Sequence, residues 1–457
     1  MKDSTHDIPI LAPAGRRFTG TDRRAPLRDG LQGCGEYGAG QTAGRFYPVA
    51  CVALEVTQRC NLDCTLCYLS DRAEMTYDPP LSVLLARLVT IQSHYGEGVS
   101  VQLTGGDPTL RKVEDLEVLC REIRRFGMRS CLMTNGIRAS RAFLTRLAAA
   151  GLDDVAFHVD MTQERSGFHS EVELNRVRRK YIDRAQGLGL RVLFNTTVFE
   201  GNVSDLPDLA RFFRDQPEVA FVSFQMQADT GRGFLRARPD TITQDSVIRA
   251  VEAGYETPLH FDAAAVGHSR CNRYAGVLTA GGRAVSVLSN HHLVQRVIGA
   301  LEQVEDGREA HLDIRASVLR LVLRRPLLAL RAAAHLLACT LRLGTGLLRG
   351  RLRRQAIFIH NFMSADALEA DRCASCVFMV ATANGPLSMC VHNAERDRHL
   401  QASDRLDGPA GPQWWNAASR NLSDHADMPG LGDLDLAPIK RLKGQLKARH
   451  RNRKDAS

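Results

Sequence analysis

The sequence predicts an α/β fold whose core is a partial (β/α)6 barrel. Between residues 47 and 230, six short apolar segments rich in Val, Phe and Leu alternate with amphipathic segments of helical period. This alternation is typical of repeated βα units with a parallel sheet, and right-handed crossovers curl such a sheet toward a barrel. Polar motifs also follow several of the predicted strands, at the edge where α/β sheets bind ligands.

The elements of this core can be placed in chain order. The expected strands cover residues 47–57, 99–103, 130–134, 154–159, 191–198 and 219–226. The expected helices between them cover residues 81–94, 113–126, 139–150, 171–186 and 206–215. We therefore assign residues 47–235 to the barrel core.

Three further regions surround the core. Residues 1–46 are polar, rich in Gly and Arg, and lack a hydrophobic period, so we expect a flexible N-terminal arm. Residues 236–400 are expected to form a smaller C-terminal region with its own cysteines. Residues 401–457 end in a basic stretch and are expected to be a partly disordered tail.

Composition limits the class of protein. Of the 457 residues, 44% are hydrophobic and 24% are charged, which is ordinary for a globular protein. The net charge of +9 favours an anionic partner such as a phospholipid surface, a nucleic acid or a phosphorylated substrate, without choosing among them. The 12 cysteines are too unevenly spaced for a secreted disulfide framework, and residues 1–20 hold no apolar leader segment. We expect a cytoplasmic protein.

Three cysteines lie close together on the loop after the first predicted strand. Cys60, Cys64 and Cys67 have the spacing C-x3-C-x2-C. Thiolates are the usual ligands of a 4Fe–4S cluster, so three of them hold three irons and leave one iron open to a ligand. The alternative is a zinc knuckle with a distant fourth ligand, because structural zinc takes four. The position of the loop at the end of a predicted strand, where α/β sheets bind ligands, favours the open cluster.

Polar residues follow the next strands. Gly105 and Gly106 permit close backbone approach, and Asp107 precedes a proline that restricts its backbone. Asn135 follows the third strand and Asp160 ends the fourth, where both can offer polar atoms to a ligand. The alternative for the Gly-Gly-Asp-Pro and Asn-Gly sequences is an ordinary tight turn.

These motifs together resemble the radical SAM superfamily. The resemblance implies a [4Fe–4S] cluster whose open iron binds S-adenosylmethionine (SAM), and reductive cleavage of SAM to a 5′-deoxyadenosyl radical that abstracts hydrogen from a substrate. It also implies an external electron donor such as ferredoxin or flavodoxin, and it does not favour a nucleic acid as partner. The broad resemblance covers about residues 47–230.

The resemblance also implies roles for individual residues. Cys60, Cys64 and Cys67 are implied to hold the catalytic cluster. Gly105, Gly106 and Asp107, which stand where the family has a GGEP motif, are implied to receive the ammonium group of SAM, with Asn135 and Asp160 near its ribose. The family has an aromatic residue just before the third cysteine, whereas this chain has Leu66 there and Tyr68 just after. Tyr68 is therefore the aromatic candidate for cofactor contact.

A second group of cysteines lies in the C-terminal region. Cys373 and Cys376 form a C-x2-C pair, Cys390 follows, and Cys271 lies in an earlier loop with a neighbouring His. Four such thiols can enclose an auxiliary iron–sulfur cluster or a structural zinc ion, and the spacing does not decide which. Cys34, in the predicted arm, is a stray thiol or a distant ligand. The other cysteines lie in apolar segments and are expected to be buried: Cys51, Cys120, Cys131 and Cys339.

Residues 317–354 contain nine Arg and no acidic residue. On a helix, Arg320, Arg324, Arg331, His335, Arg342 and Arg349 fall within an arc of about 60°, and Leu, Val and Ala occupy most of the remainder. A basic stripe on an apolar helix is typical of a helix that lies in a membrane interface. The alternative is a set of helices that bury their Leu faces on the barrel. Pro326 and Gly344 are expected to break the segment.

The segment from residue 358 to residue 393 resembles a narrower group, the radical SAM proteins related to archaeal tetraether lipid synthase, formerly described as pterin-methyltransferase-like. This resemblance implies modification of an unactivated C–H position on a lipid alkyl chain, by C–C coupling or alkyl modification, and a protein at the inner face of the membrane. Two alternatives stay open. One is a radical SAM peptide maturase with a SPASM-like auxiliary cluster, and the other is a non-catalytic iron–sulfur or zinc protein that binds a membrane.

Overall fold

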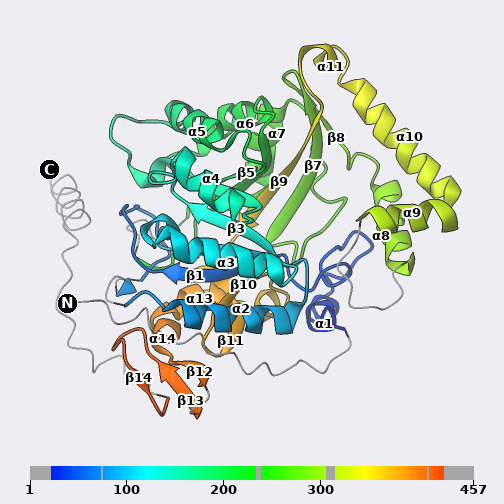
Figure 1. Cartoon of the computed structure of the whole chain (residues 1–457). Helices are drawn as coiled ribbons and strands as arrows, with labels where there is room; N and C mark the ends of the chain where they lie inside the picture. The colour runs from blue at the N-terminus through cyan, green and yellow to red at the C-terminus, as the bar shows by residue number, and fades with distance from the viewer. Residues whose placement is uncertain are drawn as a thin grey trace.

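The computed structural model describes residues 22–70, 72–73, 76–232, 238–304, 314–408 and 411–426. These residues form an eleven-stranded, mostly parallel sheet whose order is β11-β10-β1-β2-β3-β4-β5-β6-β9-β7-β8. Helices cover one face of the central strands and the sheet curls into a partial barrel (Figure 1). The predicted fold class is therefore confirmed.

The six predicted strands of the core are confirmed to within a few residues. They are β1 (Cys51–Thr57), β2 (Ser100–Gly105), β3 (Arg129–Thr134), β4 (Asp154–His158), β5 (Arg191–Val198) and β6 (Val219–Met226). Each is parallel to its neighbour, and β1 begins the register with Cys51 opposite Ser100. The carboxyl ends of all six strands therefore meet at one end of the barrel.

The helices between these strands also lie where the sequence predicts them. They are α2 (Leu81–Tyr95), α3 (Val113–Arg125), α4 (Arg141–Ala149), α5 (Glu171–Ala185) and α6 (Leu206–Arg214). Their apolar stripes face the sheet, where Leu88, Leu119 and Leu147 are fully buried in one hydrophobic cluster with the strands. Each such leucine contributes about 1.5–3 kcal/mol of burial free energy, which fixes the strand ends that carry the site.

The C-terminal region joins the core sheet at both edges. On one side, β9 (Arg353–Asn361) runs parallel to β6, and β7 (Asn272–Ala280) and β8 (Arg283–Ser286) follow antiparallel. On the other side, β10 (Phe378–Thr382) runs parallel to β1 and pairs with β11 (Gly385–Ser388). Helix α7 (Gln244–Tyr255) links β6 to this region, and α12 (Ala370–Ala374), α13 (Met389–Ala394) and α14 (Arg396–Gln401) surround β10 and β11.

Two parts of the chain are more ordered than the sequence predicts. Residues 1–21 of the expected arm lie outside the described residues, but α1 (Ala25–Gly33) buries Leu27 and Leu31 in a cluster with Val266 and Val377. The expectation of a flexible arm is therefore wrong for residues 22–46. In the expected tail, β12 (Asp404–Gly408), β13 (Gly411–Trp415) and β14 (Leu422–Ser423) form a small antiparallel sheet, and residues 427–457 lie outside the described residues.

The Arg-rich segment forms separate helices rather than one. These are α9 (Ile314–Arg324), α10 (Pro326–Arg342) and α11 (Gly346–Arg349), and they follow α8 (His291–Val304). The predicted breaks at Pro326 and near Gly344 are confirmed. His335 departs from the predicted outward stripe because its Nε2 lies 3.0 Å from the carbonyl oxygen of Val287. Arg353 and Arg354 belong to β9.

Candidate functional site

A cavity of about 680 Å³ lies inside the barrel. At the carboxyl ends of the strands it is lined by Cys60, Cys64 and Cys67 and by the backbone of Gly105 and Gly106. The three thiols are partly buried, and burial raises the pKa of Cys60 to about 11. The structure thus brings the predicted cysteine loop and the glycine motif to one end of one cavity.

Backbone hydrogen bonds hold the cysteine loop from two sides. The amide of Thr65 donates to the carbonyl of Thr162 after β4, at 2.8 Å. The amide of Arg232, after β6, donates to the carbonyls of Cys67 (2.9 Å) and Leu69 (2.8 Å). The loop conformation is therefore set by neighbouring strand ends rather than by the loop alone.

The two glycines of the second motif are required by the cysteine loop itself. A Cβ atom on Gly105 would lie 2.0 Å from the carbonyl oxygen of Thr57, and one on Gly106 would lie 2.0 Å from that of Arg59. The amide of Gly106 donates to the Thr57 carbonyl at 2.8 Å. Gly105 also has a φ of +117°, which L side chains rarely adopt. The close backbone approach predicted for these glycines is therefore to the end of β1 and to the residues that lead into the cysteine loop.

Asp107 does not line the cavity. Its side chain is fully buried, and its carboxylate accepts hydrogen bonds from the amide and hydroxyl of Thr109, the hydroxyl of Thr134 and the amide of Asn135. These bonds tie the end of β2 to the end of β3. With its acceptor capacity used in this way, Asp107 positions the motif. The implied contact of Asp107 with an ammonium group stays a prediction.

Asp160 repeats the same arrangement two strands later. Its buried carboxylate accepts from the amide (3.0 Å) and hydroxyl (2.5 Å) of Thr162 and from the amide of Thr197 (2.8 Å). Both acids begin a short 3-10 turn in an Asp-x-Thr sequence. Asp160 therefore positions the neighbouring strand ends and does not line the cavity, and its implied place near a ribose stays a prediction, whereas its neighbour on the strand does line the cavity.

That neighbour is His158, a cavity residue that the sequence reasoning did not single out. Its Nε2 lies 2.6 Å from Oδ2 of Asp160 and 3.2 Å from the hydroxyl of Thr197. Burial works to lower the pKa of His158, but the charge and hydrogen bond of Asp160, with a smaller effect from Glu171, raise it above 6.5, and Arg165 opposes this. In return, His158 helps to lower the pKa of Asp160 against the effect of burial.

Replacement of Asp160 by Asn is expected to lower the pKa of His158 below 6.5, since burial and Arg165 are then opposed only by the smaller effect of Glu171. In the unchanged protein, the stabilisation from this pair is fully present below pH 6.5 and is lost as the pH rises through the higher folded-state pKa. An NMR titration of the histidine ring protons measures both values. A wild-type His158 that titrates below 6.5 contradicts the assignment.

Asn135 lines the cavity but is committed to the cysteine loop. Its side-chain nitrogen Nδ2 lies 2.7 Å from Oδ1 of Asn61 and 4.0 Å from the sulfur of Cys60. Its side-chain oxygen Oδ1 accepts a hydrogen bond from the backbone amide of Ile137 at 3.0 Å. Asn135 is thus placed beside the sulfur of Cys60. Its implied position near a ribose remains a prediction.

Tyr68 lines the cavity beside a buried charged group. Its hydroxyl donates to the carbonyl of Gly105, and the guanidinium of Arg396 lies 4.7 Å from its ring centroid. Arg396 pairs with Glu55 of β1 at 2.6 Å. Burial works to raise the pKa of Glu55, but the charges of Arg396 and His392 outweigh it and lower the pKa to about 2. Sequence reasoning missed this pair because 341 residues separate the two partners along the chain.

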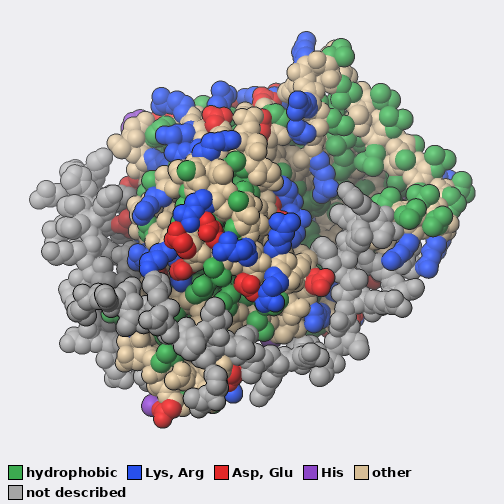
Figure 2. Space-filling model, in the orientation of Figure 1, with side chains coloured by type: hydrophobic (Ala, Val, Ile, Leu, Met, Phe, Trp, Pro, Cys, Tyr) green, Lys and Arg blue, Asp and Glu red, His purple; other side chains and the backbone are tan. Residues whose placement is uncertain are grey.

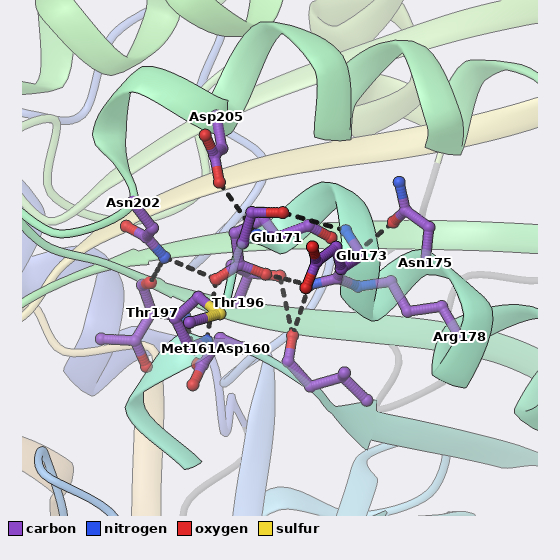
Figure 3. Close-up of polar contacts among 12 residues, drawn as sticks. Asp160, Met161, Glu171, Glu173, Asn175, Arg178, Thr196, Thr197, Asn202 and Asp205 are labelled. Carbon is purple, nitrogen blue, oxygen red and sulfur yellow. Dashed lines mark hydrogen bonds and ion pairs between the residues drawn. The ribbon is translucent and has the colours of Figure 1, made fainter. Parts of the chain in front are cut away.

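A buried ion pair supports the β4 end of the cavity. Glu171 and Arg178 of α5 are both fully buried and form an ion pair (Figure 3). Arg178 also donates to the carbonyl of Val159 at 2.7 Å, and Glu171 accepts from the amide of Met161 at 2.9 Å. The pair therefore holds both residues that flank Asp160, which are Val159 and Met161.

The second cysteine group assembles behind the cavity. A small cavity of about 20 Å³ is lined by Cys271, Cys376 and Cys390. Burial raises the pKa of Cys390 to about 12, with further contributions from Cys376 and Cys271. Burial has the largest effect in raising the pKa of Cys373, and Cys376 raises it further. The four predicted thiols of this site are thus close enough to affect one another.

Two further contacts characterise this group. Nε of Arg372 donates to the sulfur of Cys271 at 3.1 Å. Burial raises the pKa of Cys271, and the hydrogen bond and charge of Arg372 oppose this rise without cancelling it. The sulfur of Cys34 lies 3.7 Å from the hydroxyl of Ser375, between Cys373 and Cys376 in the chain. Cys34 therefore lies beside the C-x2-C pair in the folded chain, although its position in the sequence gives no sign of this. The cysteines expected to be structural are confirmed as buried: Cys51, Cys120, Cys131 and Cys339.

The donor set fits an iron–sulfur cluster. Within the ranges described, no three His, Cys, Asp or Glu side chains are grouped closely enough for a single metal ion. A cube of four irons is wider than one ion, so its thiolates must stand apart around a common space. The thiols of Cys60, Cys64 and Cys67 are partly exposed and line one cavity, where all three are accessible to a cluster.

Comparison with known proteins gives the following matches. Residues 54–213 match the model of the Radical SAM superfamily. The chain is 26% identical over 197 residues to the Fe-coproporphyrin III synthase of Methanosarcina barkeri, covering 43% of this chain and 48% of the relative. It is 31% identical over 230 residues to the PqqA peptide cyclase of Bradyrhizobium diazoefficiens, covering 47% of this chain and 57% of the relative.

A third relative is the 7,8-dihydro-6-hydroxymethylpterin dimethyltransferase of Methanocaldococcus jannaschii, 26% identical over 186 residues, with 39% of this chain and 36% of the relative covered. Among solved structures, the chain is similar to SuiB of Streptococcus suis bound to S-adenosylmethionine, with a TM-score of 0.36, 15% identity, and 45% and 46% of the two chains covered. The chain therefore spans between 36% and 57% of the length of these curated relatives.

Proposed function

We propose, from the radical SAM superfamily domain of residues 54–213, that this chain cleaves S-adenosylmethionine reductively and uses the resulting radical on an alkyl C–H position of a lipid. The observation that carries the first step is the C-x3-C-x2-C loop, whose three thiols line the same cavity as Gly105 and Gly106. The observation that favours a lipid is the exposed apolar surface of α9 and α10.

Residues of this chain would hold the cofactors as follows. Cys60, Cys64 and Cys67 would ligate a [4Fe–4S] cluster. When bound beside its open iron, SAM supplies the 5′-deoxyadenosyl radical. The carbonyl and amide groups of Gly105 and Gly106 lie at the same cavity end, while Asp107 and Asp160 fix the surrounding strand ends. The ring of His158 lines the cavity and contacts Asp160. It would act there as a hydrogen-bond partner for sugar hydroxyls or as a base.

The apolar surface lies on α9 and α10. These helices bury few leucines against α8, chiefly Leu321 and Leu328, and expose most of the others. Leu323 is 73% exposed, Leu327 is 74% exposed and Leu330 is 66% exposed. Figure 2 shows the resulting patch of hydrophobic side chains, with Lys or Arg side chains at its margin. Contiguous exposed apolar patches of this kind mark interaction sites.

An anionic membrane is the partner that this chemistry fits. Arg320, Arg324 and Arg331 are exposed on the same helices as the leucines, and each basic residue near an anionic surface adds about 1 kcal/mol of attraction. Over the described ranges, the model has no helix with the length and apolarity needed to cross a bilayer. The proposed contact is therefore a peripheral one, through the surface formed by α9 and α10.

Replacement of Leu323, Leu327 and Leu330 by Glu is expected to reduce binding to anionic liposomes at least tenfold, because it removes apolar burial and adds negative charge. Co-sedimentation with phosphatidylglycerol vesicles measures this. Val172→Glu, on α5, is the control because that valine is 45% exposed outside the patch. Equal binding by the triple variant and the control contradicts a membrane role for these helices.

The second cysteine group is proposed to hold an auxiliary iron–sulfur cluster. Phe362, Phe378 and Met389 line both this site and the main cavity, so a single layer of side chains separates them. The contact between Arg372 and Cys271 supports metal binding through thiolates. Iron and sulfide analysis of a Cys373→Ala, Cys376→Ala variant should give about half the wild-type content, and zinc in the wild-type protein would contradict the proposal.

The proposed reaction is tested by anaerobic incubation with SAM, dithionite and a membrane-lipid extract. We expect 5′-deoxyadenosine together with a lipid of altered mass. The likeness to a PqqA peptide cyclase favours a second candidate, a peptide substrate. A lipid-free peptide library in a parallel incubation separates the two, since a peptide enzyme would increase 5′-deoxyadenosine formation only there.

A further inference from the structure

The cavity runs the length of the barrel and reaches both ends. At one end it is lined by the cysteine loop, and at the other by residues that begin strands: Cys51, Ser100, Arg129, Asp154 and Arg191. The side chain of Arg129 is 42% exposed and that of Arg191 is 52% exposed, so this second end opens to solvent. Strands of five to eight residues, at about 3.3 Å each, make the passage roughly 17–25 Å long.

The lining between the two ends is mostly apolar. It is formed by Ala53, Met133, Ala156, Leu193 and Phe221, with Gln102, Asn195 and Ser223 as polar members. Ala53 and Ala156 are small side chains at the third positions of β1 and β4, which leaves the passage open at mid-height. Such a passage fits a slender apolar chain.

The second end carries an excess of positive charge. Arg191 pairs with the carboxylate of Asp154 at 2.5 Å, and Arg129 lies 3.6 Å from the same carboxylate. Arg23 also lines this end, and within the described ranges its buried Nε has no hydrogen-bond partner. Glu97, Asp22 and Arg24 also line this end, so four guanidiniums face three carboxylates. Asp22 is already shared by Arg24 and Arg28.

This end adjoins the proposed membrane surface. Phe46 lines the cavity just before β1 and packs in one cluster with Ile298 of α8. Helix α8 in turn packs on α9 and α10 through Leu293, Leu321 and Leu328. Figure 1 shows α8, α9 and α10 together on one side of the molecule. The passage therefore has its catalytic residues at one end and a lipid-facing surface beside the other.

We propose that this second end is the entrance for a single-chain amphiphile with an anionic head group. The carboxylate or phosphate head would bind Arg23, Arg129 and Arg191, and the alkyl chain would extend through the passage to the cysteine loop. This inference rests on the proposed function, and it adds the substrate class, the route of entry and the residues that choose it. On this proposal, the lengths of the strands set how long an alkyl chain must be to reach the cysteine loop.

The test uses cis-parinaric acid, an 18-carbon fluorescent fatty acid, with the full chain. The Arg129→Gln, Arg191→Gln variant should bind the acid about tenfold more weakly, which is the loss of one charge-assisted hydrogen bond. Its affinity for parinaric acid methyl ester should change less than twofold, which also shows that the passage is intact. Ala156→Phe should weaken both ligands at least tenfold, and Arg121→Gln, on the exposed face of α3, should change neither.

Competition by hexadecanoate and by hexadecyl phosphate separates a fatty acid from a lipid phosphate as the natural head group. Acid binding that is unchanged in both the arginine variant and Ala156→Phe overturns the proposal. Formation of 5′-deoxyadenosine by the same proteins tests the radical function independently. If it persists without any effect of these substitutions on parinaric acid binding, the entrance is wrong and the proposed radical chemistry stands. If parinaric acid binds as expected but no 5′-deoxyadenosine forms, the entrance is right and the proposed function fails.

Discussion

Simultaneous replacement of Cys60, Cys64 and Cys67 by Ala is expected to abolish 5′-deoxyadenosine formation, to below about one thousandth of the wild-type rate. Among the described residues, these three thiols line one end of the barrel cavity, and no other cysteine lines that end. Without them the cluster has no thiolate ligands, and the chemistry it supplies is lost entirely rather than reduced. Anaerobic reconstitution followed by mass spectrometry measures the product.

The matched control removes two buried cysteines that do not line the cavity. Cys120 and Cys339 are buried, so their replacement by Ala should lower stability while leaving the reconstituted iron content of the catalytic site and the SAM cleavage activity in place. Cleavage of SAM by the Cys60, Cys64, Cys67 variant at a rate near that of this control would contradict the assignment of the cluster ligands.

Arg178→Met is expected to destabilise the protein by about 3–5 kcal/mol, because it leaves the buried carboxylate of Glu171 without its partner. Arg178 and Glu171 have no exposed side-chain surface. The lost bond to the carbonyl of Val159 should also release the Asp160 turn, so SAM cleavage should fall together with stability. Urea denaturation followed by circular dichroism measures the free energy of unfolding.

The double variant Arg178→Met, Glu171→Leu separates charge from packing. Replacing both partners of a buried ion pair by apolar residues is often close to neutral, so the double variant should recover most of the lost stability. A double variant as unstable as the single one would mean that the hydrogen bonds of Glu171 to Met161 and Asn202, rather than the charge of the pair, hold this region.

The core could be predicted from the sequence because its signals are local. Each strand from β1 to β6 is a short apolar segment followed by an amphipathic helix, and the C-x3-C-x2-C spacing lies within eight residues. The pairing of β10 with β1 could not be predicted in this way. Cys51 and Phe378 are partners in the sheet, but nothing in their local sequences indicates a partner so far along the chain.

The contacts of Asp107 and Asp160 could not be predicted from the motifs that contain them. Asp107 and Asp160 follow strand ends, as ligand-binding residues do, yet both are buried acceptors for neighbouring backbone amides. The Asp-x-Thr sequence they share, Asp107 with Thr109 and Asp160 with Thr162, was the available signal for a capped turn. His158 was visible in the sequence, but its importance depends on the contact with Asp160 in the folded chain.

The central claim is that one iron of a cluster held by Cys60, Cys64 and Cys67 is open to a ligand. The most direct measurement is the electron paramagnetic resonance spectrum of the anaerobically reduced protein, recorded before and after addition of SAM. We predict a [4Fe–4S] signal whose g values shift when SAM is added, and no such signal in the Cys60, Cys64, Cys67 variant in which Cys271, Cys373, Cys376 and Cys390 are also replaced. Zinc in place of iron, or a wild-type spectrum that SAM leaves unchanged, would contradict the account.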